Sequence, residues 1–146
     1  LAAATAPDPG LQVARLEREV EALRGRAALV DGSPGERLAA VEQLAAGPAD
    51  PRAQEALLRA LETDRSVNVQ LAALDGLRRV ADLGAAQGRL VALLDRPESP
   101  VLRTALIELL VERRVVGARE VLHTLTGNTT DPALQSRARW ALRQLS

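Results

Sequence analysis

The stretch Asp64-Arg65-Ser66-Val67-Asn68-Val69-Gln70-Leu71-Ala72-Ala73-Leu74-Asp75-Gly76-Leu77 has counterparts before and after it in the chain, at a nearly constant spacing. Its repeated feature is a set of mostly apolar positions four residues apart, which lie on one face of a helix. In the four copies these positions are Glu36, Ala40 and Leu44; Val69, Ala73 and Leu77; Leu102, Leu106 and Leu110; and Leu134, Ala138 and Leu142. Self-similarity at a period of this length is typical of stacked helix pairs, each of which buries its apolar face against its neighbours. The sequence therefore predicts an all-α fold with the architecture of a right-handed α-solenoid.

The composition narrows the class of partner. Nineteen basic residues, all of them Arg, balance nineteen acidic residues, so no net charge favours nucleic acid or an anionic membrane surface. The chain has no Cys, which removes disulfides and thiolate metal sites. No run approaches the roughly 18 apolar residues that a membrane-spanning helix needs, and Met is absent. We therefore expect a piece of a longer protein that binds no nucleic acid and reaches a membrane only through a segment upstream of Leu1.

The start of the chain, up to Asp31, differs from the repeats. Residues 1–10 are rich in Ala and Pro and predict a linker. Residues 11–31 predict an amphipathic helix, because apolar residues recur at alternating spacings of three and four, as in a short coiled coil. This seam consists of Val13, Leu16, Val20, Leu23, Ala27 and Val30. Two interpretations remain open: the helix packs on the first repeat as a cap, or it forms a homodimer coil or a stalk.

Residues 33–146 make up the predicted repeat domain. Ser33 precedes Pro34 and Asp50 precedes Pro51, and such side chains accept hydrogen bonds from the free N–H groups at a helix start. The expected helices span residues 34–46, 51–62, 67–81, 85–94, 100–113, 118–126 and 132–145. They form three helix pairs preceded by one further repeated helix.

A row of long polar residues falls near the start of each repeated helix, on its buried side. At about 100° per residue, Gln70 lies between Ala73 and Leu74. The complete row is Arg37, Gln70, Arg103 and Gln135. A partly buried polar side chain needs a partner, most simply a turn carbonyl or a neighbouring side chain. We therefore predict a structural ladder that fixes the stack of repeats.

A second row, on the side away from the core, is predicted to bind a protein. We place it on the concave surface of the stack and call it the strip. It consists of Leu71, Asp75, Arg78, Thr104, Glu108, Val111 and Trp140. We expect Leu71, Val111 and Trp140 to be exposed beside charged residues, which suits a modest protein-binding surface. In the alternative interpretation the row is a solvated helix face, and Trp140 covers the end of the stack.

Residues for catalysis are scarce. His123 is the one histidine, and we expect it to be a partly exposed repeat residue. A histidine-bearing triad would have to use it, and a zinc site would lack its usual ligands. We therefore predict a domain that is not an enzyme and has no cofactor or metal.

The repeats resemble HEAT repeats over residues 35–146. In that family a "Val-Arg-x-x-Ala-x-x-x-Leu" type start follows the turn, and here Val69-Gln70, Leu102-Arg103 and Leu134-Gln135 occupy it. Gln70 and Gln135 depart from the usual Arg, so a continuous Arg ladder is not expected. The resemblance implies stacked helix pairs and a role in binding proteins.

Three segments, residues 16–24, 33–38 and 67–75, also resemble the extracytoplasmic part of bacterial zinc-finger anti-sigma-factor-like membrane proteins. In that family a cytoplasmic zinc-binding domain holds a sigma factor, one helix crosses the membrane, and a short coil leads into HEAT repeats. The resemblance implies a non-catalytic interaction or sensory domain on the periplasmic side of the bacterial inner membrane. The alternative is a soluble, cytoplasmic HEAT-repeat scaffold with no membrane link.

Overall fold

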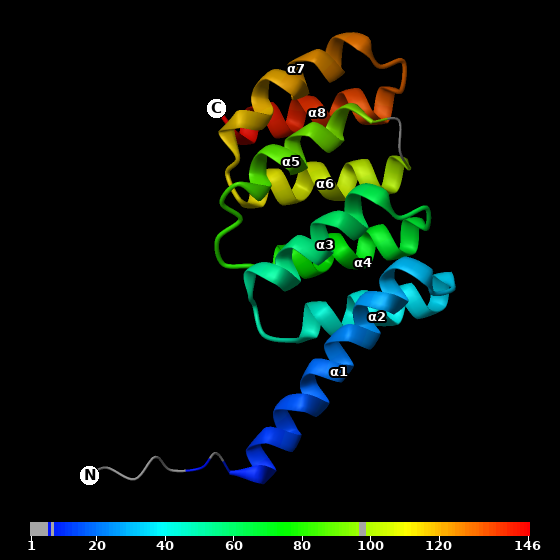
Figure 1. Cartoon of the computed structure of the whole chain (residues 1–146). Coiled ribbons are helices and arrows are strands. Elements are labelled where there is room, and N and C mark those ends of the chain that lie inside the picture. Colours follow the sequence, from blue (N-terminus) through cyan, green and yellow to red (C-terminus); the bar gives the residue numbers. More distant parts are fainter. Residues whose placement is uncertain (1–5, 7, 97–98) are drawn as a thin grey trace, which may run out of the picture.

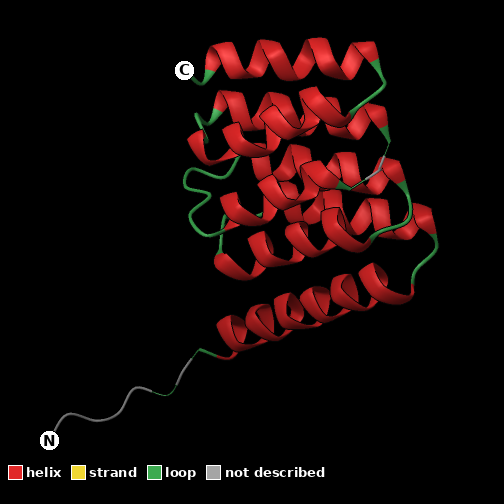
Figure 2. Cartoon of the chain, turned by 90° about the horizontal axis from the view of Figure 1, so that it is seen from above, coloured by secondary structure: helices red, strands yellow, loops and turns green. Residues whose placement is uncertain are grey.

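A computed structural model describes residue 6 and residues 8–96 and 99–146. In this part of the chain every regular element is a helix, and no strand occurs (Figures 1 and 2). The α-helices are α1 (Pro9–Asp31), α2 (Pro34–Ala46), α3 (Pro51–Thr63), α4 (Val67–Arg78), α5 (Ala86–Ala92), α6 (Pro100–Glu112), α7 (Arg119–Asn128) and α8 (Pro132–Gln144). Two 3-10 helices, η1 (Leu93–Asp95) and η2 (Val116–Ala118), flank α5 and α7. The prediction of an all-α fold is confirmed.

The predicted caps explain where several helices begin. An Asp or Ser side chain accepts a backbone N–H bond at four starts, and a Pro, which has no N–H to satisfy, follows each of them. These caps are Asp8, Ser33, Asp50 and Asp131, with oxygen–nitrogen distances between 2.7 and 3.2 Å. The predictions for Ser33 and Asp50 are confirmed.

The same chemistry starts α1 earlier than expected. Asp8 caps the helix by accepting the N–H of Gly10 at 2.9 Å, and Pro9 occupies the first helical position. The prediction of a linker over residues 1–10 is therefore wrong for Pro9 and Gly10. The stretch 1–5 and residue 7 lie outside the described residues.

Several later boundaries also differ from the prediction, by up to three residues. α4 ends at Arg78 rather than at residue 81, because Arg79 and Val80 donate to the carbonyls of Gly76 and Leu77, three residues back, at 3.2 and 3.1 Å. Such bonds tighten the last turn and stop the α-helix. The predicted helix over 85–94 ends in the 3-10 turn η1 for a similar reason.

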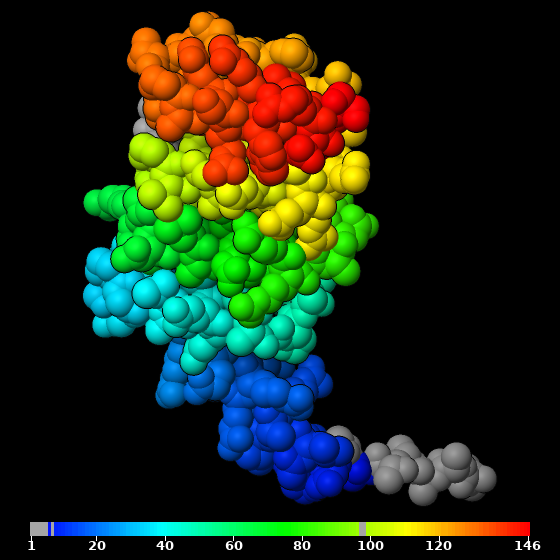
Figure 3. Space-filling view, turned by 180° about the vertical axis from the view of Figure 1, so that it is seen from behind, coloured from blue at the N-terminus to red at the C-terminus, as the bar shows by residue number. Residues whose placement is uncertain are grey.

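The helices are arranged in successive layers, from α1 and α2 at one end to α7 and α8 at the other (Figure 1). Within each layer the two α-helices contact each other, and α2, α4, α6 and α8 contact one another in that order. A space-filling view from behind shows the layers in close contact and α1, in dark blue, extending beyond them (Figure 3). Among the helices described, none has the length and apolar content to span a membrane.

One aliphatic core runs through α2 to α8, from Val41 to Leu145. Its fully buried members include Leu77, Leu90 and Ile107. Gly76 allows a close approach between α4 and α2, since a Cβ atom there would lie 2.9 Å from the Cβ of Ala45. The core therefore needs small residues as well as large ones, as the repeated Ala and Leu pattern suggests.

The helix α1 stands apart from this core. None of its residues is buried. Gly25, Ala28 and Leu29 are half-buried, and Leu29 packs against the core. The repeats therefore hold α1 through the end nearest to α2.

Candidate functional site

The apolar members of the strip are less exposed than the sequence suggested. Leu71, Val111 and Trp140 lie on α4, α6 and α8, and all three are half-buried because they pack against the core. The expectation that these side chains are exposed is therefore wrong. An angle on a helical wheel does not include the neighbouring layer, which covers part of each side chain.

The charged members of the strip are paired between neighbouring layers. Nε of Arg78 in α4 lies 3.5 Å from Oε2 of Glu112 in α6. One layer further, Glu108 in α6 lies 3.5 Å from Nη1 of Arg137 in α8. All four side chains are between 37% and 50% exposed, so water screens these pairs and each contributes about 0–1 kcal/mol. Their main effect is to align one layer with the next.

The remaining members of the strip lie on both sides of these pairs. Asp75 is exposed and pairs at 3.1 Å with Arg79, the residue that directly follows α4. Thr104 is half-buried. At the far end, the guanidinium of Arg137 lies 5.3 Å from the centre of the Trp140 ring, which is a cation–π geometry. The strip thus combines paired charged side chains with half-buried apolar ones.

The ladder residues reach main-chain carbonyls at the end of the preceding helix or in the turn that follows it. Gln70, which is buried, donates from Nε2 to the carbonyl of Leu61 at 3.2 Å. Gln135 donates to the carbonyl of Thr129 at 2.8 Å, and Arg103 donates to the carbonyl of Arg96. Each bond gives a partner to a carbonyl near a helix end, where helices leave such groups free. The role of the row in holding the stack together remains a prediction.

Arg37, the first member of the ladder, makes the largest set of contacts. Its Nε and Nη2 atoms donate to the two carboxylate oxygens of Asp64 at 2.8 and 3.2 Å, and Nη1 donates to the carbonyl of Gly32 at 2.8 Å. The hydrogen bond with Asp64 raises the pKa of Arg37, with a smaller opposing effect of burial. A planar fork matched to a carboxylate fixes both distance and angle. Arg37 thereby joins α2 to the turn between α3 and α4.

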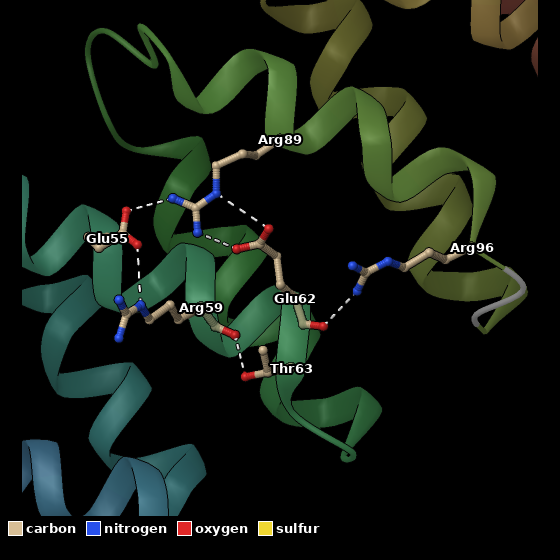
Figure 4. A network of polar contacts seen from close by, with 6 residues as sticks. All are labelled: Glu55, Arg59, Glu62, Thr63, Arg89 and Arg96. Carbon is tan, nitrogen blue, oxygen red and sulfur yellow. Dashed lines mark hydrogen bonds and ion pairs between the residues drawn. The ribbon is translucent and has the colours of Figure 1, made fainter.

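A polar network on α3 and α5 was not foreseen (Figure 4). Arg89 bonds Glu62 through two nitrogens and donates to Glu55 at 2.6 Å. The bonds with Glu62 and Glu55 raise the pKa of Arg89. The bond from Arg89 is also the largest cause that lowers the pKa of Glu55. Nearby, Arg96 donates to the main-chain carbonyl of Glu62 at 2.9 Å, so α3 is tied to the next layer at two points.

Part of this network could have been predicted from the spacing of charged residues in the sequence. Glu55 and Glu62 are seven residues apart on one helix, so they share a face. Arg89 lies 34 residues after Glu55, close to one repeat period, and 27 residues after Glu62. Comparing charged residues about one repeat apart would have suggested the pair of Glu55 and Arg89, but not the contact with Glu62.

Arg113 was also missed. It lies just after α6 and donates to the carbonyls of Arg78, Val80 and Ala81, the last at 3.1 Å. These carbonyls belong to the end of α4 and the turn that follows it. Arg113 therefore satisfies the main chain where α4 stops.

The seam of α1 holds most of the exposed large hydrophobic side chains among the described residues. Val13, Leu16, Val20, Leu23 and Val30 are between 45% and 79% exposed, and Ala27 is exposed as well. The helix does contact the first repeat, since α1 packs against α2, but the seam is not the face that it uses. The residues of α1 that approach α2 are not those of the seam.

The half-buried residues of α1 lie mainly on the side of the helix opposite to the seam. At about 100° per residue, Gly25 and Leu29 fall about 160° from Ala27, on the face of α1 opposite to the seam, and Ala28 falls about 100° from Ala27, beside that face. The half-buried face of α1 thus points toward the repeats and its seam points away from them. At the end of the seam, Val30 borders an open groove whose other wall includes Arg52 and Glu55 of α3.

The other concavities offer little to a small ligand. One lies between the α2–α3 loop and the end of α4. Its Gln54 donates to the carbonyl of Leu83 at 3.2 Å, and its Asp50 accepts the N–H of Ala53 at 2.7 Å. The polar groups best placed to hold a ligand there are engaged in local structure.

The described residues include no cluster of three His, Cys, Asp or Glu side chains that could hold a metal ion. His123 is exposed on α7. The surfaces that stand out are thus the strip and the seam of α1, and neither carries a constellation of reactive groups. No protein-family model, curated protein or solved structure was found to match this chain.

Proposed function

We propose that this chain is a protein-interaction domain in which a stack of helical repeats carries a protruding helix, α1. The observation that carries the proposal is the open apolar face of α1. Each large apolar side chain left in water forgoes about 1.5–3 kcal/mol of burial energy. A helix that exposes a regular row of such side chains is typical of a binding element.

The proposal includes the architecture of the repeats. We infer that the layers form a right-handed α-solenoid of HEAT-like repeats, with α1 as its stalk. Two observations support this: the sequence pattern recurs at a nearly constant period, and α2, α4, α6 and α8 follow one another in contact. Solenoids of this kind bind proteins along an extended surface.

The strip is the proposed surface for a protein partner. It crosses three successive layers, and Asp75 and Trp140 lie toward its two ends. Charged rims around modest apolar patches are typical of transient interfaces. A partner there would contact several layers at once and could change how they hold α1.

The wider context of the proposal is a regulator of the anti-sigma-factor-like type. The resemblance of residues 16–24, 33–38 and 67–75 supports it. In this proposal the repeats lie on the extracytoplasmic side of a bacterial inner membrane. A partner binds the strip, the position of α1 changes, and α1 transmits the change to a membrane segment upstream.

The coding sequence upstream of Leu1 tests this context. A His-x-x-x-Cys-x-x-Cys cluster followed by about 20 apolar residues is expected, because the first holds zinc and the second spans a membrane. A start codon close to Leu1, with neither feature, would remove the regulator and leave a soluble HEAT-like scaffold.

Photo-crosslinking tests the strip itself. A photoreactive amino acid replaces Asp75 or Thr104 in the whole protein, expressed in its own cells. We expect a crosslinked product of higher mass from both positions. A matched replacement of Glu120, exposed on α7 outside the strip, should give none. The absence of any product from the two strip positions would show that the strip is not a binding site.

A further inference from the structure

We propose that α1 pairs with α1 of a second copy of this chain in a parallel, two-stranded coiled coil. This inference rests on the proposed function, because it names the partner of the same helix. The contact would use the seam, which faces away from the repeats and has no partner among the described residues. Pairing would bury it without disturbing the contact between α1 and α2.

The residue types in the seam favour this geometry. Spacings of three and four assign Val13, Val20 and Ala27 to the a positions of a heptad, and Leu16, Leu23 and Val30 to the d positions. A β-branched residue at a with Leu at d favours two parallel strands. The first two heptads have this combination, and Ala27 allows a closer approach where the helices reach the repeats.

Charges beside the seam are complementary in the same arrangement. In a parallel coil the g residue of one helix lies beside the e residue of the next heptad on its partner. This juxtaposes Glu19 with Arg24, and Arg26 with Asp31, and twofold symmetry makes each pair twice. Within the described part of the chain, Arg26 and Asp31 form no ion pair of their own. Glu19 bonds Arg15 at 3.2 Å and Arg24 lies 3.8 Å from Glu21, and both are exposed contacts that Glu19 and Arg24 can exchange for each other.

An antiparallel coil is the main competitor. It would place Glu19 beside Arg26 and Glu17 beside Arg24, so the charges alone do not exclude it. The division of Val and Leu between a and d separates the two arrangements. The parallel form also places the N-terminal ends of both α1 helices at one end of the coil and both repeat domains at the other. This is the arrangement needed if the two chains are anchored to the same membrane through segments upstream of Leu1.

The mass in solution tests self-association of the full chain. The seam has fewer than three heptads, so a dimer is expected only at high concentration. Sedimentation equilibrium should show the mass rising from 15.5 kDa toward twice that value as concentration increases to about 1 mM. Leu16→Glu with Leu23→Glu should keep the chain monomeric. Arg18→Gln with Ala22→Glu changes the net charge equally, lies off the seam and should dimerise like the parent.

Disulfide trapping tests the orientation. The chain has no Cys, so an introduced thiol is unique. In a parallel coil the two copies of residue 13 meet, and Val13→Cys should form a disulfide-linked dimer under mild oxidation. In an antiparallel coil residue 13 meets residue 30, and only Val13→Cys with Val30→Cys would link. Arg18→Cys, on the opposite face, should stay monomeric in either case.

The outcomes separate this inference from the function on which it rests. A mass of one chain at every concentration overturns the homodimer, and a link that needs both Cys residues overturns the parallel orientation. In neither case do the crosslinks from the strip change, so the interaction domain stands or falls on its own test. The circular dichroism spectra of both double variants should remain those of a helical protein, because α1 buries no residue and its substitution leaves the core of the repeats intact.

Discussion

Arg37 in α2 holds Asp64, the residue that ends α3, through two parallel hydrogen bonds of 2.8 and 3.2 Å. Asp64 in turn accepts the N–H of Ser66 at 2.9 Å, at the start of α4. A single guanidinium therefore links the first repeated helix to the turn of the next pair. The core continues from α2 to one neighbouring layer only, since α1 on the other side of α2 buries no residue. We therefore expect this link to contribute more to the stability of the fold than a surface ion pair would.

We expect Arg37→Ala to lower the melting temperature by about 5 °C. Arg37→Lys should recover only part of the loss, because an ammonium cannot bond both carboxylate oxygens in one plane. Thermal unfolding followed by circular dichroism measures both variants. An unchanged melting temperature for Arg37→Ala would mean that the ladder does not hold the stack at this end.

Gln70 offers a stricter test of the ladder, because it is the one buried polar side chain of the described core. Gln70→Leu should lower the free energy of unfolding by about 1–3 kcal/mol, since the carbonyl of Leu61 loses its partner in a buried place. Gln135→Leu is the matched control. Its side chain is only half-buried and its lost carbonyl partner can be replaced by water, so we expect a smaller effect in urea unfolding.

Acid should weaken the contact between Glu55 and Arg89. The pKa of Glu55 lies below its ordinary 4.5 in the folded chain, mainly because Arg89 donates a hydrogen bond to it. A carboxyl whose pKa is lower in the folded chain stabilises the fold above the pKa of the unfolded chain. This stabilisation is lost as pH falls through the lower, folded value.

We therefore expect the parent chain to lose more stability than Glu55→Gln between about pH 5 and pH 3. Glu55 is 45% exposed, so screening by water keeps the difference below about 1 kcal/mol. Urea unfolding at several pH values measures it, with Glu120→Gln as the control for loss of a surface carboxylate. Equal slopes for the parent and Glu55→Gln would show that the pair adds nothing to folding.

Arg114 has a strained backbone that a substitution can relieve. Its φ is +50°, which is in the left-handed region that non-Gly residues rarely adopt. The turn needs this conformation, because Val115 then donates to the carbonyl of Leu110 at 2.9 Å and closes α6. Arg114→Gly should raise the free energy of unfolding by about 0.5–1 kcal/mol. Gly84→Ala, at a second position with φ of +50°, should lower it.

The all-helical fold and several helix starts were predictable from the sequence. Ser33 and Asp50 mark helix starts because Asp or Ser before Pro has a local, chemical cause. The end of α4 was not predictable in this way. Its last carbonyls bond Arg113, which is more than thirty residues away, so the boundary depends on a contact between layers.

In the candidate site, too, features with a local cause were predictable and features that depend on contacts between layers were not. Gln70 could be placed on a buried face from its angle alone, and its partner is a nearby turn. The exposure of Leu71 and Trp140 could not, because the adjoining layer decides how much of each side chain remains in water. The seam of α1 was visible in the sequence, but the sequence did not say which face of that helix the repeats use.

The separation of α1 from the core predicts two unfolding events. Most of the stability of a helix in a protein comes from tertiary packing, and α1, which buries no residue, gains little of it. Trp140 is the sole Trp and lies in α8, so its fluorescence reports the repeats and not α1.

At low protein concentration, circular dichroism should show a loss of helix at less urea than is needed to change the Trp140 signal. Amide hydrogen exchange should then be fast throughout residues 9–24 and slow in α4. Coincident transitions and slow exchange in both helices would mean that Leu29 couples α1 to the stack more strongly than its half-burial suggests.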